Sequence, residues 1–230
     1  MNTISRMPGK LSLPILRLAV PALLFFTGPA MPRPLQGQAA RPNVVFIMTD
    51  DVGYGDIGSY GAPDVSTPNI DQLARDGTMF TDFYANAPVC TPTRAGFITG
   101  RYQQRLGLES PLSGPARENG RGLTANGRTL PQLLQNNGYE TGLIGKWHLG
   151  YELDQSPNAH GFDHFFGFKS GYIDYYQHTG GGGFEDLWEN ERLVEVDGYM
   201  TDLITERSAD FIREHADTPF FLSVQFNAAH

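Results

Sequence analysis

The sequence predicts an α/β domain in which a mostly parallel sheet is sandwiched between helices. Three apolar runs have the length of strands, at residues 43–48, 141–145 and 220–226. The first is continuously apolar rather than alternating, which is typical of a strand buried on both faces. Segments with helix start and stop signals lie between the runs. Strands that alternate with helices favour a parallel sheet with both faces covered.

The elements follow from local signals, taken in chain order. The first strand, 43–48, stops at an acidic pair, and Thr67-Pro68 then supplies a helix cap and a proline at the first helical position, with Gly77 past the end. Residues 79–84 are a second strand candidate. Thr91 and Pro92 repeat the helix-start signal, which predicts a helix to about Thr99.

The second half continues the alternation. Thr129 and Pro131 begin a helix that stops at Gly138, and the strand 141–145 follows. A longer helix at about 199–215 carries several residues on one shared face and precedes the last strand, 220–226. The shared face comprises Leu203, Ile204, Ser208, Phe211 and Ile212. Residues 171–191 are rich in Tyr and Gly without helical or strand period, which predicts a long surface loop that lines a substrate cleft.

The first forty residues predict a leader that is not part of the domain. They combine basic residues with the apolar run 18–26 and end in small residues, the layout of a secretory signal peptide. The run is too short for a membrane-spanning helix, so we expect a signal peptide and leader at 1–40 and no stable membrane anchor. The globular domain is then expected at 41–230, in the periplasm or outside the cell.

Composition excludes several classes of protein. The chain has 17 basic and 25 acidic residues, and every acid lies after residue 40. Such a surface repels phosphate backbones and argues against binding to nucleic acid. With a single cysteine, Cys90, the chain cannot form an internal disulfide.

Cys90 stands at the predicted start of a helix, in the segment Cys90-Thr91-Pro92-Thr93-Arg94. The amino end of a helix favours anions, and the guanidinium of Arg94 one turn later suits a tetrahedral oxyanion. The pattern favours a nucleophile that handles anions over the alternative of a small buried hydrophobic residue. It argues against a thiol phosphatase, because that phosphate loop needs Arg six positions after Cys and here the position is Gly96.

Further polar residues follow the predicted strands. Asp50 and Asp51 end the first strand, where paired carboxylates suit a hard divalent cation, although turn formation is an equal alternative. Lys146 and His148 follow another strand, alternate along an expected extended segment and project from the same edge. His230 follows the last strand, so one sheet edge is predicted to collect all these groups.

Together these residues resemble the type I sulfatase family of the alkaline-phosphatase-like superfamily. The resemblance rests on the Cys-x-Pro-x-Arg motif at Cys90 and on Thr99-Gly100-Arg101, and it spans the whole stretch after the leader. Supporting segments are Pro42 to Asp51, Lys146-Trp147-His148-Leu149-Gly150 and His160-Gly161-Phe162-Asp163. Thr93 departs from the family, where Ser is commoner. The resemblance implies that a maturing enzyme, such as the formylglycine-generating enzyme, oxidises Cys90 to formylglycine before the chain folds.

The resemblance also implies a sulfuric ester hydrolase with a calcium ion. Asp50, Asp51 and the modified Cys90 would bind calcium, and a hydroxyl of the hydrated aldehyde would attack the sulfur of a sulfate ester. The second hydroxyl would then expel sulfate, with His148 as its base. Arg94 would hold the modified residue, while Lys146 and His230 would bind sulfate, with His230 a candidate acid for the leaving alcohol. The expected substrate is a sulfated small molecule or carbohydrate.

Two other functions stay open at this point. A phosphonate monoester or phosphodiester hydrolase of the same superfamily can use the same modified cysteine. Sulfate monoesters and phosphodiesters both present a singly charged tetrahedral centre, so the motif does not separate these substrates. A non-catalytic carbohydrate-binding remnant is the alternative from another class. Family members continue beyond the strand that precedes His230 with further metal ligands, so we expect residues 41–230 alone to bind calcium weakly and to hydrolyse sulfate esters poorly. We also expect 220–226 to form the exposed edge of the sheet.

Overall fold

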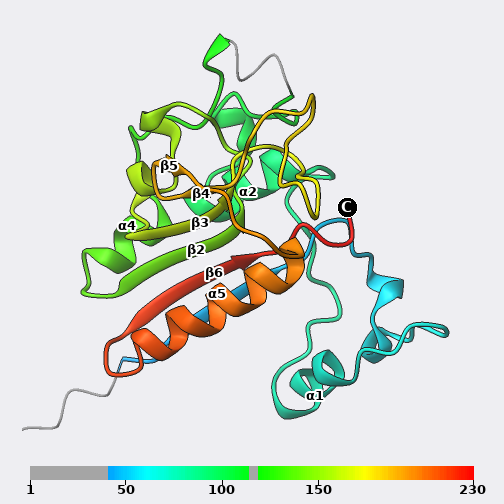
Figure 1. Ribbon diagram of the computed structural model, residues 1–230. Coiled ribbons are helices and arrows are strands. Elements are labelled where there is room, and N and C mark those ends of the chain that lie inside the picture. The colour runs from blue at the N-terminus through cyan, green and yellow to red at the C-terminus, as the bar shows by residue number, and fades with distance from the viewer. Residues whose placement is uncertain (1–40, 114–118) are drawn as a thin grey trace, which may run out of the picture. The chain divides into compact units, whose positions relative to one another are not determined.

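A six-stranded sheet forms the centre of the computed structural model, which describes residues 41–113 and 119–230. The strand order is β1-β6-β2-β3-β4-β5 (Figure 1). β1, β6, β2 and β3 pair in parallel, whereas β4 and β5 are antiparallel. The strands are β1 (Val44–Met48), β2 (Glu140–Lys146), β3 (His164–Phe168), β4 (Trp188–Glu189), β5 (Arg192–Leu193) and β6 (Phe220–Gln225). The expected α/β class with a mostly parallel sheet is confirmed.

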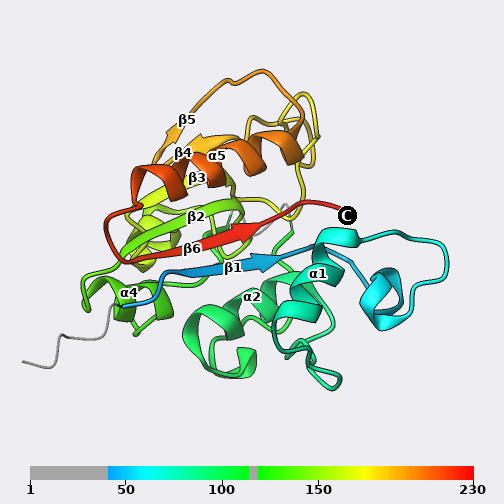
Figure 2. The same ribbon diagram turned by 90° about the horizontal axis from the view of Figure 1, so that it is seen from below.

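Helices cover both faces of the sheet. The helices of the described residues with more than one turn are α1 (Pro68–Asp76), α2 (Cys90–Thr99), α4 (Leu130–Gln135) and α5 (Met200–Glu214). Single 3₁₀ turns lie at Tyr54–Asp56, Gly58–Tyr60, Gln103–Arg105, Leu153–Gln155 and Asn158–His160. Figure 2 shows α5 on one side of the sheet and α2 and α4 on the other. The predicted sandwich of helices around a sheet is therefore present.

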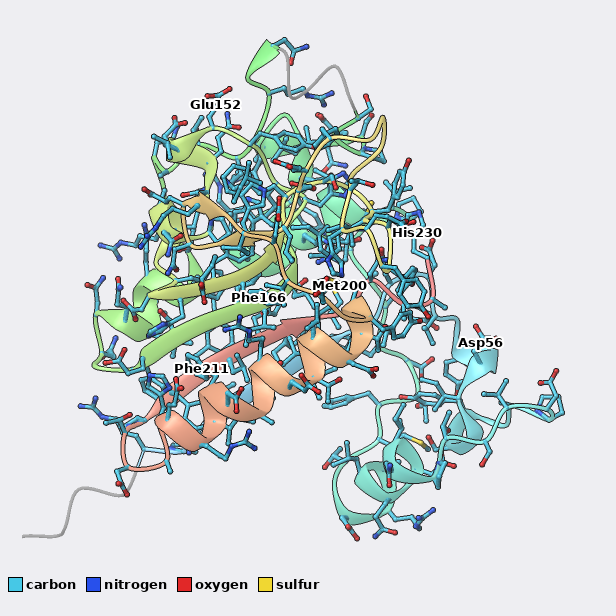
Figure 3. All side chains as sticks on the ribbon, in the orientation of Figure 1. Asp56, Glu152, Phe166, Met200, Phe211 and His230 are labelled. Carbon is cyan, nitrogen blue, oxygen red and sulfur yellow. The ribbon has the colours of Figure 1, made fainter. Side chains whose placement is uncertain are left out.

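Strand alternation divides the core into two apolar clusters. Leu143 of β2 points into the cluster beneath α2 and α4, and its neighbour Ile144 points into the cluster beneath α5. Phe166 and Phe211, labelled in Figure 3, belong to this second cluster. Because every second side chain of a strand faces the same side, a continuous apolar run fills both clusters at once.

The boundaries of α1, α4 and α5 agree closely with the start and stop signals read from the sequence. α1 begins at Pro68 with Gly77 at its end, as expected. Thr129 caps α4 by accepting a hydrogen bond from the backbone N–H of Gln132, and α5 ends at Glu214 with His215 as its cap. On α5, four of the five residues expected on the inner face are buried, whereas Ile212 is 39% exposed.

Three elements differ from the prediction. Residues 79–84 form no strand, and Phe80 and Phe83 are 63% and 80% exposed, because no described strand lies beside them to pair with. β3 was not expected as a strand. The stretch 171–191 is not wholly loop either, since it closes on two isolated bridges and ends in β4.

The two edge strands of the sheet are β1 and the short β5. Val45 and Ile47 of β1 are 45% and 56% exposed. The expectation that 220–226 would form the exposed edge was wrong, because β6 lies between β1 and β2 and all six of its residues are buried. The last strand in the sequence is thus central in the sheet, and it sets the position of the residues that follow it.

Residues Arg41–His230 form one compact unit. None of the helices in the part of the chain that the structure describes is long and apolar enough to cross a membrane. The expected signal peptide and leader, 1–40, lie outside the described residues.

Candidate active site

Pairing between β1 and β6 continues past the ends of both strands and brings Asp50 beside His230. The backbone N–H of Asp50 donates to the Ala228 carbonyl at 2.9 Å, and the Ala229 N–H donates to the Asp50 carbonyl at 2.7 Å. His230, labelled in Figure 3, therefore lies at the carboxyl end of the sheet. The carboxyl ends of parallel strands are where α/β proteins build their sites.

A glycine allows β2 to approach β6 at this edge. Gly145 has φ +112, and a Cβ there would lie 1.9 Å from the carbonyl oxygen of Gln225. Only a residue without a side chain fits, because both the backbone conformation and the space exclude Cβ. Lys146 follows directly, so its ammonium is delivered to the same edge as Asp50.

Four side chains form a cluster of charged and titratable groups, which we call the Asp50 cluster: Asp50, Arg94, Lys146 and His230. The first three are buried, whereas the His230 side chain is 40% exposed. The Lys146 ammonium donates to Asp50 Oδ2, and both side chains are almost fully buried. His230 Nδ1 lies 3.0 Å from the same oxygen, and Arg94 Nη2 lies 3.6 Å from Oδ1. Burial opposes ionisation of Asp50, but Lys146 and Arg94 outweigh it and lower the pKa of the carboxyl. The cluster thus holds one buried carboxylate against two cations.

Arg94 is oriented by acceptors on the neighbouring strands. Its Nη1 donates to the Lys146 carbonyl at 2.8 Å and to Gln225 Oε1, while Nε and Nη2 are buried without a hydrogen-bond partner. Gln225 is itself held by a 2.8 Å bond from its Nε2 to Ser223 Oγ. Buried donors without partners are rare in proteins, and here they give Arg94 free capacity to bind an anion.

Cys90 is the first residue of α2. The helix begins there with Val89 as its N-cap and without a side-chain cap, so the predicted start at Pro92 was wrong. Thr91 is no cap either, because its hydroxyl donates to the His148 carbonyl at 3.0 Å and accepts from the Leu112 N–H. Cys90 is half-buried and lies within electrostatic range of Arg94 and Lys146, whose pKa values burial lowers. The cysteine therefore combines a helix amino end with two nearby cations.

His148 is held as a neutral imidazole of defined tautomer. Its Nε2 lies 2.7 Å from the Leu112 carbonyl, which can only accept, so Nε2 carries the proton. Nδ1 is buried without a partner and keeps its lone pair. Burial, together with the nearby cations Lys146 and Arg94, lowers the pKa of His148 to about 3. The expectation that Lys146 and His148 alternate along an extended segment was wrong, because His148 has φ +56.

The carboxylates at the end of β1 can form part of a metal site. Asp50, Asp51 and His230 each place a possible ligand atom within 4.8 Å of the others. Asp51 has φ +57 and an exposed side chain beside His230. Carboxylate oxygens fit calcium, whereas an imidazole nitrogen does not suit it, and calcium takes about 6–8 oxygen ligands. The two carboxylates therefore fit calcium as part of a larger ligand set.

The loop after β3, part of the stretch that the sequence predicts to line a substrate cleft, contacts the residues of the site. A Cβ on Gly171 would lie 2.8 Å from the His148 ring, so the loop passes directly over that imidazole. The Tyr175 hydroxyl donates to the His230 carbonyl at 3.2 Å, and the Tyr172 ring lies 6.3 Å from the His230 ring. Sequence reasoning missed Gln225 and the Leu112 carbonyl. A glutamine at the end of an otherwise apolar strand was the available signal for Gln225.

The sulfatase family profile matches residues 42–230. The chain belongs to the sulfatase family. It is 40% identical to arylsulfatase J of Mus musculus over 210 residues, which cover 86% of this chain and 34% of that protein. It is 34% identical to N-acetylgalactosamine-6-sulfatase of Sus scrofa over 215 residues, 84% of this chain and 41% of that protein. The chain thus spans well under half the length of these curated relatives.

Solved structures agree with the family and with the fold. The chain superposes on Ps i-CgsB, solved in complex with k-i-k-neocarrahexaose, with a TM-score of 0.76 and 34% identity over 83% of this chain and 46% of that chain. A second structure, solved in complex with its substrate D-glucosamine-2-N,6-O-disulfate, gives a TM-score of 0.68 at 33% identity, covering 83% of this chain and 35% of that chain. The resemblance to the sulfatases drawn from the Cys90 motif is confirmed.

Proposed function

We propose that this sulfatase-family chain supplies the nucleophile and sulfate-binding groups of an enzyme that hydrolyses sulfate monoesters. The observation that carries the proposal is the convergence of Lys146, Arg94 and His230 beside the helix end that presents Cys90. Three cationic or protonatable donors at one point complement the charge that develops on sulfate oxygens during transfer.

Each side chain has a role that follows from its contacts. Lys146 and His230 bind sulfate oxygens, and the exposed part of His230 faces the departing alcohol as its acid. Arg94 uses its unpartnered Nε and Nη2 to hold the side chain at position 90. His148 accepts a proton at Nδ1, the nitrogen that its bond to Leu112 leaves free.

The proposal includes two groups that the chain must acquire, calcium and formylglycine at position 90. Asp50 and Asp51 would hold the calcium together with the modified Cys90 side chain, and the cation would help a hydroxyl of that side chain to ionise and serve as the nucleophile. The buried, lowered-pKa carboxylate of Asp50 is ionised before the cation arrives. A sulfatase-maturing enzyme is the partner that this proposal requires, and a leader at 1–40 would take the domain 41–230 to the periplasm or outside the cell.

For the substrate we propose a sulfated carbohydrate. Tyr172 is 51% exposed beside His230, where its ring offers a flat apolar face to the part of the substrate that carries the sulfate. Aromatic side chains provide large rigid contact surfaces of the kind that sugar rings stack on. The two solved relatives described above were both crystallised with carbohydrate ligands, one of them a disulfated glucosamine.

Mass spectrometry of the Cys90 peptide tests the proposal at its first step. The chain is expressed with and without a sulfatase-maturing enzyme, and we expect formylglycine only with it. Arg94→Lys is a matched variant that keeps a positive charge at this helix end but loses the fork of donors. If Cys90 stays unmodified when the chain is co-expressed with the maturing enzyme, the proposed hydrolase activity is refuted.

Rates on paired substrates test the second step. In the complete gene product that carries this domain, aryl sulfate should be hydrolysed faster than the matched aryl phosphonate. Tyr172→Ala should raise KM for a sulfated sugar while leaving KM for the small aryl sulfate unchanged. Faster phosphonate hydrolysis would assign the site to a phosphonate monoester or phosphodiester hydrolase instead.

A further inference from the structure

A second group of metal-binding side chains lies at the amino-terminal ends of the strands, at the opposite end of β2 from Lys146. Glu140 is the first residue of β2, His164 is the first residue of β3, and His215 caps α5. Figure 1 shows this end of α5 beside the beginnings of β2 and β6. The group shares no residue with the Asp50 cluster or with Asp51.

Sheet register and helix packing bring the three residues together. His164 pairs with Gly142, and Glu140 lies two residues earlier on the same face of β2. α5 approaches closely because Gly142 has no side chain: a Cβ there would lie 2.7 Å from the ring of Phe211. His215, one turn after Phe211, thereby reaches the strand ends, and possible ligand atoms of all three residues lie within 4.8 Å of one another.

The two imidazoles are oriented by neighbours. His215 Nδ1 lies 2.8 Å from the Phe211 carbonyl, and its ring stacks on the Phe211 ring at 4.2 Å. A carbonyl only accepts, so Nδ1 carries the proton and Nε2 has the free lone pair. The His164 ring lies 5.3 Å from that of His215. A histidine whose second nitrogen bonds a backbone carbonyl is the usual arrangement of a metal ligand.

We propose that Glu140, His164 and His215 form a binding site for Zn²⁺ or a similar transition-metal dication. Two imidazoles and one carboxylate are a known ligand set for zinc, with water completing the coordination. His164 is exposed and also lines a hollow of about 140 Å³ with Asp210 and Glu214, so water can reach this imidazole. Imidazole ligands favour zinc over calcium, so the site differs in metal preference from the carboxylates at the other end of the sheet. A bound ion ties the end of α5 to two strands.

Titration of the metal-free 230-residue chain with Zn²⁺ and with Co²⁺ tests the proposal. We expect one saturable site, a visible absorption band typical of four-coordinate Co²⁺, and a melting temperature that rises with Zn²⁺ concentration. His164→Gln and His215→Gln should each weaken Zn²⁺ binding about tenfold or more. Glu140→Gln, at an exposed strand end, gives a third variant that leaves the packing of α5 untouched.

The control is Asp51→Asn, which alters the other candidate metal group. Zn²⁺ binding should survive that change and should also survive an excess of Ca²⁺. The proposal fails if wild-type protein shows no saturable Zn²⁺ binding, or if Asp51→Asn abolishes binding while Glu140→Gln and His164→Gln retain it. None of these measurements depends on sulfatase activity, so a negative result for this metal site would not contradict the proposed hydrolase, and the reverse also holds.

Discussion

Replacing Asp50 by Asn should destabilise the chain far more than replacing Lys146 by Met, although the two residues form one ion pair. Asp50 is the only buried carboxylate of the Asp50 cluster, and it faces two buried cations, Lys146 and Arg94. Without its charge, both cations stay buried and repel each other. Lys146→Met instead leaves Asp50 with Arg94 at 3.6 Å and His230 at 3.0 Å, and it removes a buried ammonium.

The magnitudes follow from burial. The side chains of Asp50 and Lys146 are 6% and 0% exposed, so solvent screens their interaction little. Removing one partner of a buried pair costs about 3–5 kcal/mol, and we expect about 3 kcal/mol for Asp50→Asn because the amide keeps an acceptor oxygen. Lys146→Met should cost about 1 kcal/mol, since the remaining pairs stay intact and a long apolar side chain fills the same volume.

Urea unfolding of the 230-residue chain and of the two single variants and the double variant measures this difference. The double variant should be more stable than Asp50→Asn alone, which gives a coupling energy of about 2 kcal/mol. The slope of the free energy of unfolding against urea concentration should be the same for wild type and the variants, so that the differences between them report stability alone. Equal costs for the two single changes, or a coupling energy near zero, would refute the argument that unpaired buried cations dominate.

Four other outcomes follow from the structure. Because the folded pKa of Asp50 is lowered, its stabilisation is complete above its unfolded pKa of about 3.9 and is lost as pH falls through the lower folded value. Urea unfolding between about pH 5 and pH 2 should therefore show a steeper loss of stability in wild type than in Asp50→Asn. The ring of His148, with a pKa of about 3, should show no NMR titration from about pH 8 to pH 4, and its proton should reside on Nε2. Gly145→Ala should prevent folding, because its Cβ would meet the Gln225 carbonyl. Gly182→Ala, at φ +96 in open space, should lower the free energy of unfolding by only about 1 kcal/mol. Circular dichroism and urea unfolding compare the two variants. Calorimetry should find that the 230-residue chain binds calcium weakly, with a dissociation constant of about 10⁻³ M, and a tight site would contradict the ligand count.

Local signals in the sequence were sufficient for most elements and for bringing Asp50, Lys146 and His230 to one edge of the sheet. Thr129 and Pro131 predicted α4, and the apolar runs predicted β1, β2 and β6, because caps and burial depend on neighbouring residues. The same reasoning failed at 79–84, where a strand candidate rich in aromatic residues stays exposed. Whether such a run becomes a strand depends on a partner strand, which no local signal specifies.

Tertiary contacts account for what sequence reasoning missed in the site. The sequence placed Asp50 and His230 at one edge, but their direct contact depends on β6 entering between β1 and β2. The tautomer of His148 depends on a carbonyl 36 residues earlier in the chain, that of Leu112. Backbone acceptors such as this leave no trace in residue identity, so only the folded chain reveals them.

The central position of β6 also governs when the chain can fold as it leaves the ribosome. Among the described strands β1 pairs only with β6, and α2, which begins at Cys90, packs into a cluster that includes Phe221. Neither contact exists until residues 220–225 have been synthesised. Cys90 consequently lies in a chain that lacks these contacts while the residues from 91 to about 220 are synthesised. Topology alone thus provides an interval in which an enzyme acting on unfolded chains has access to this cysteine.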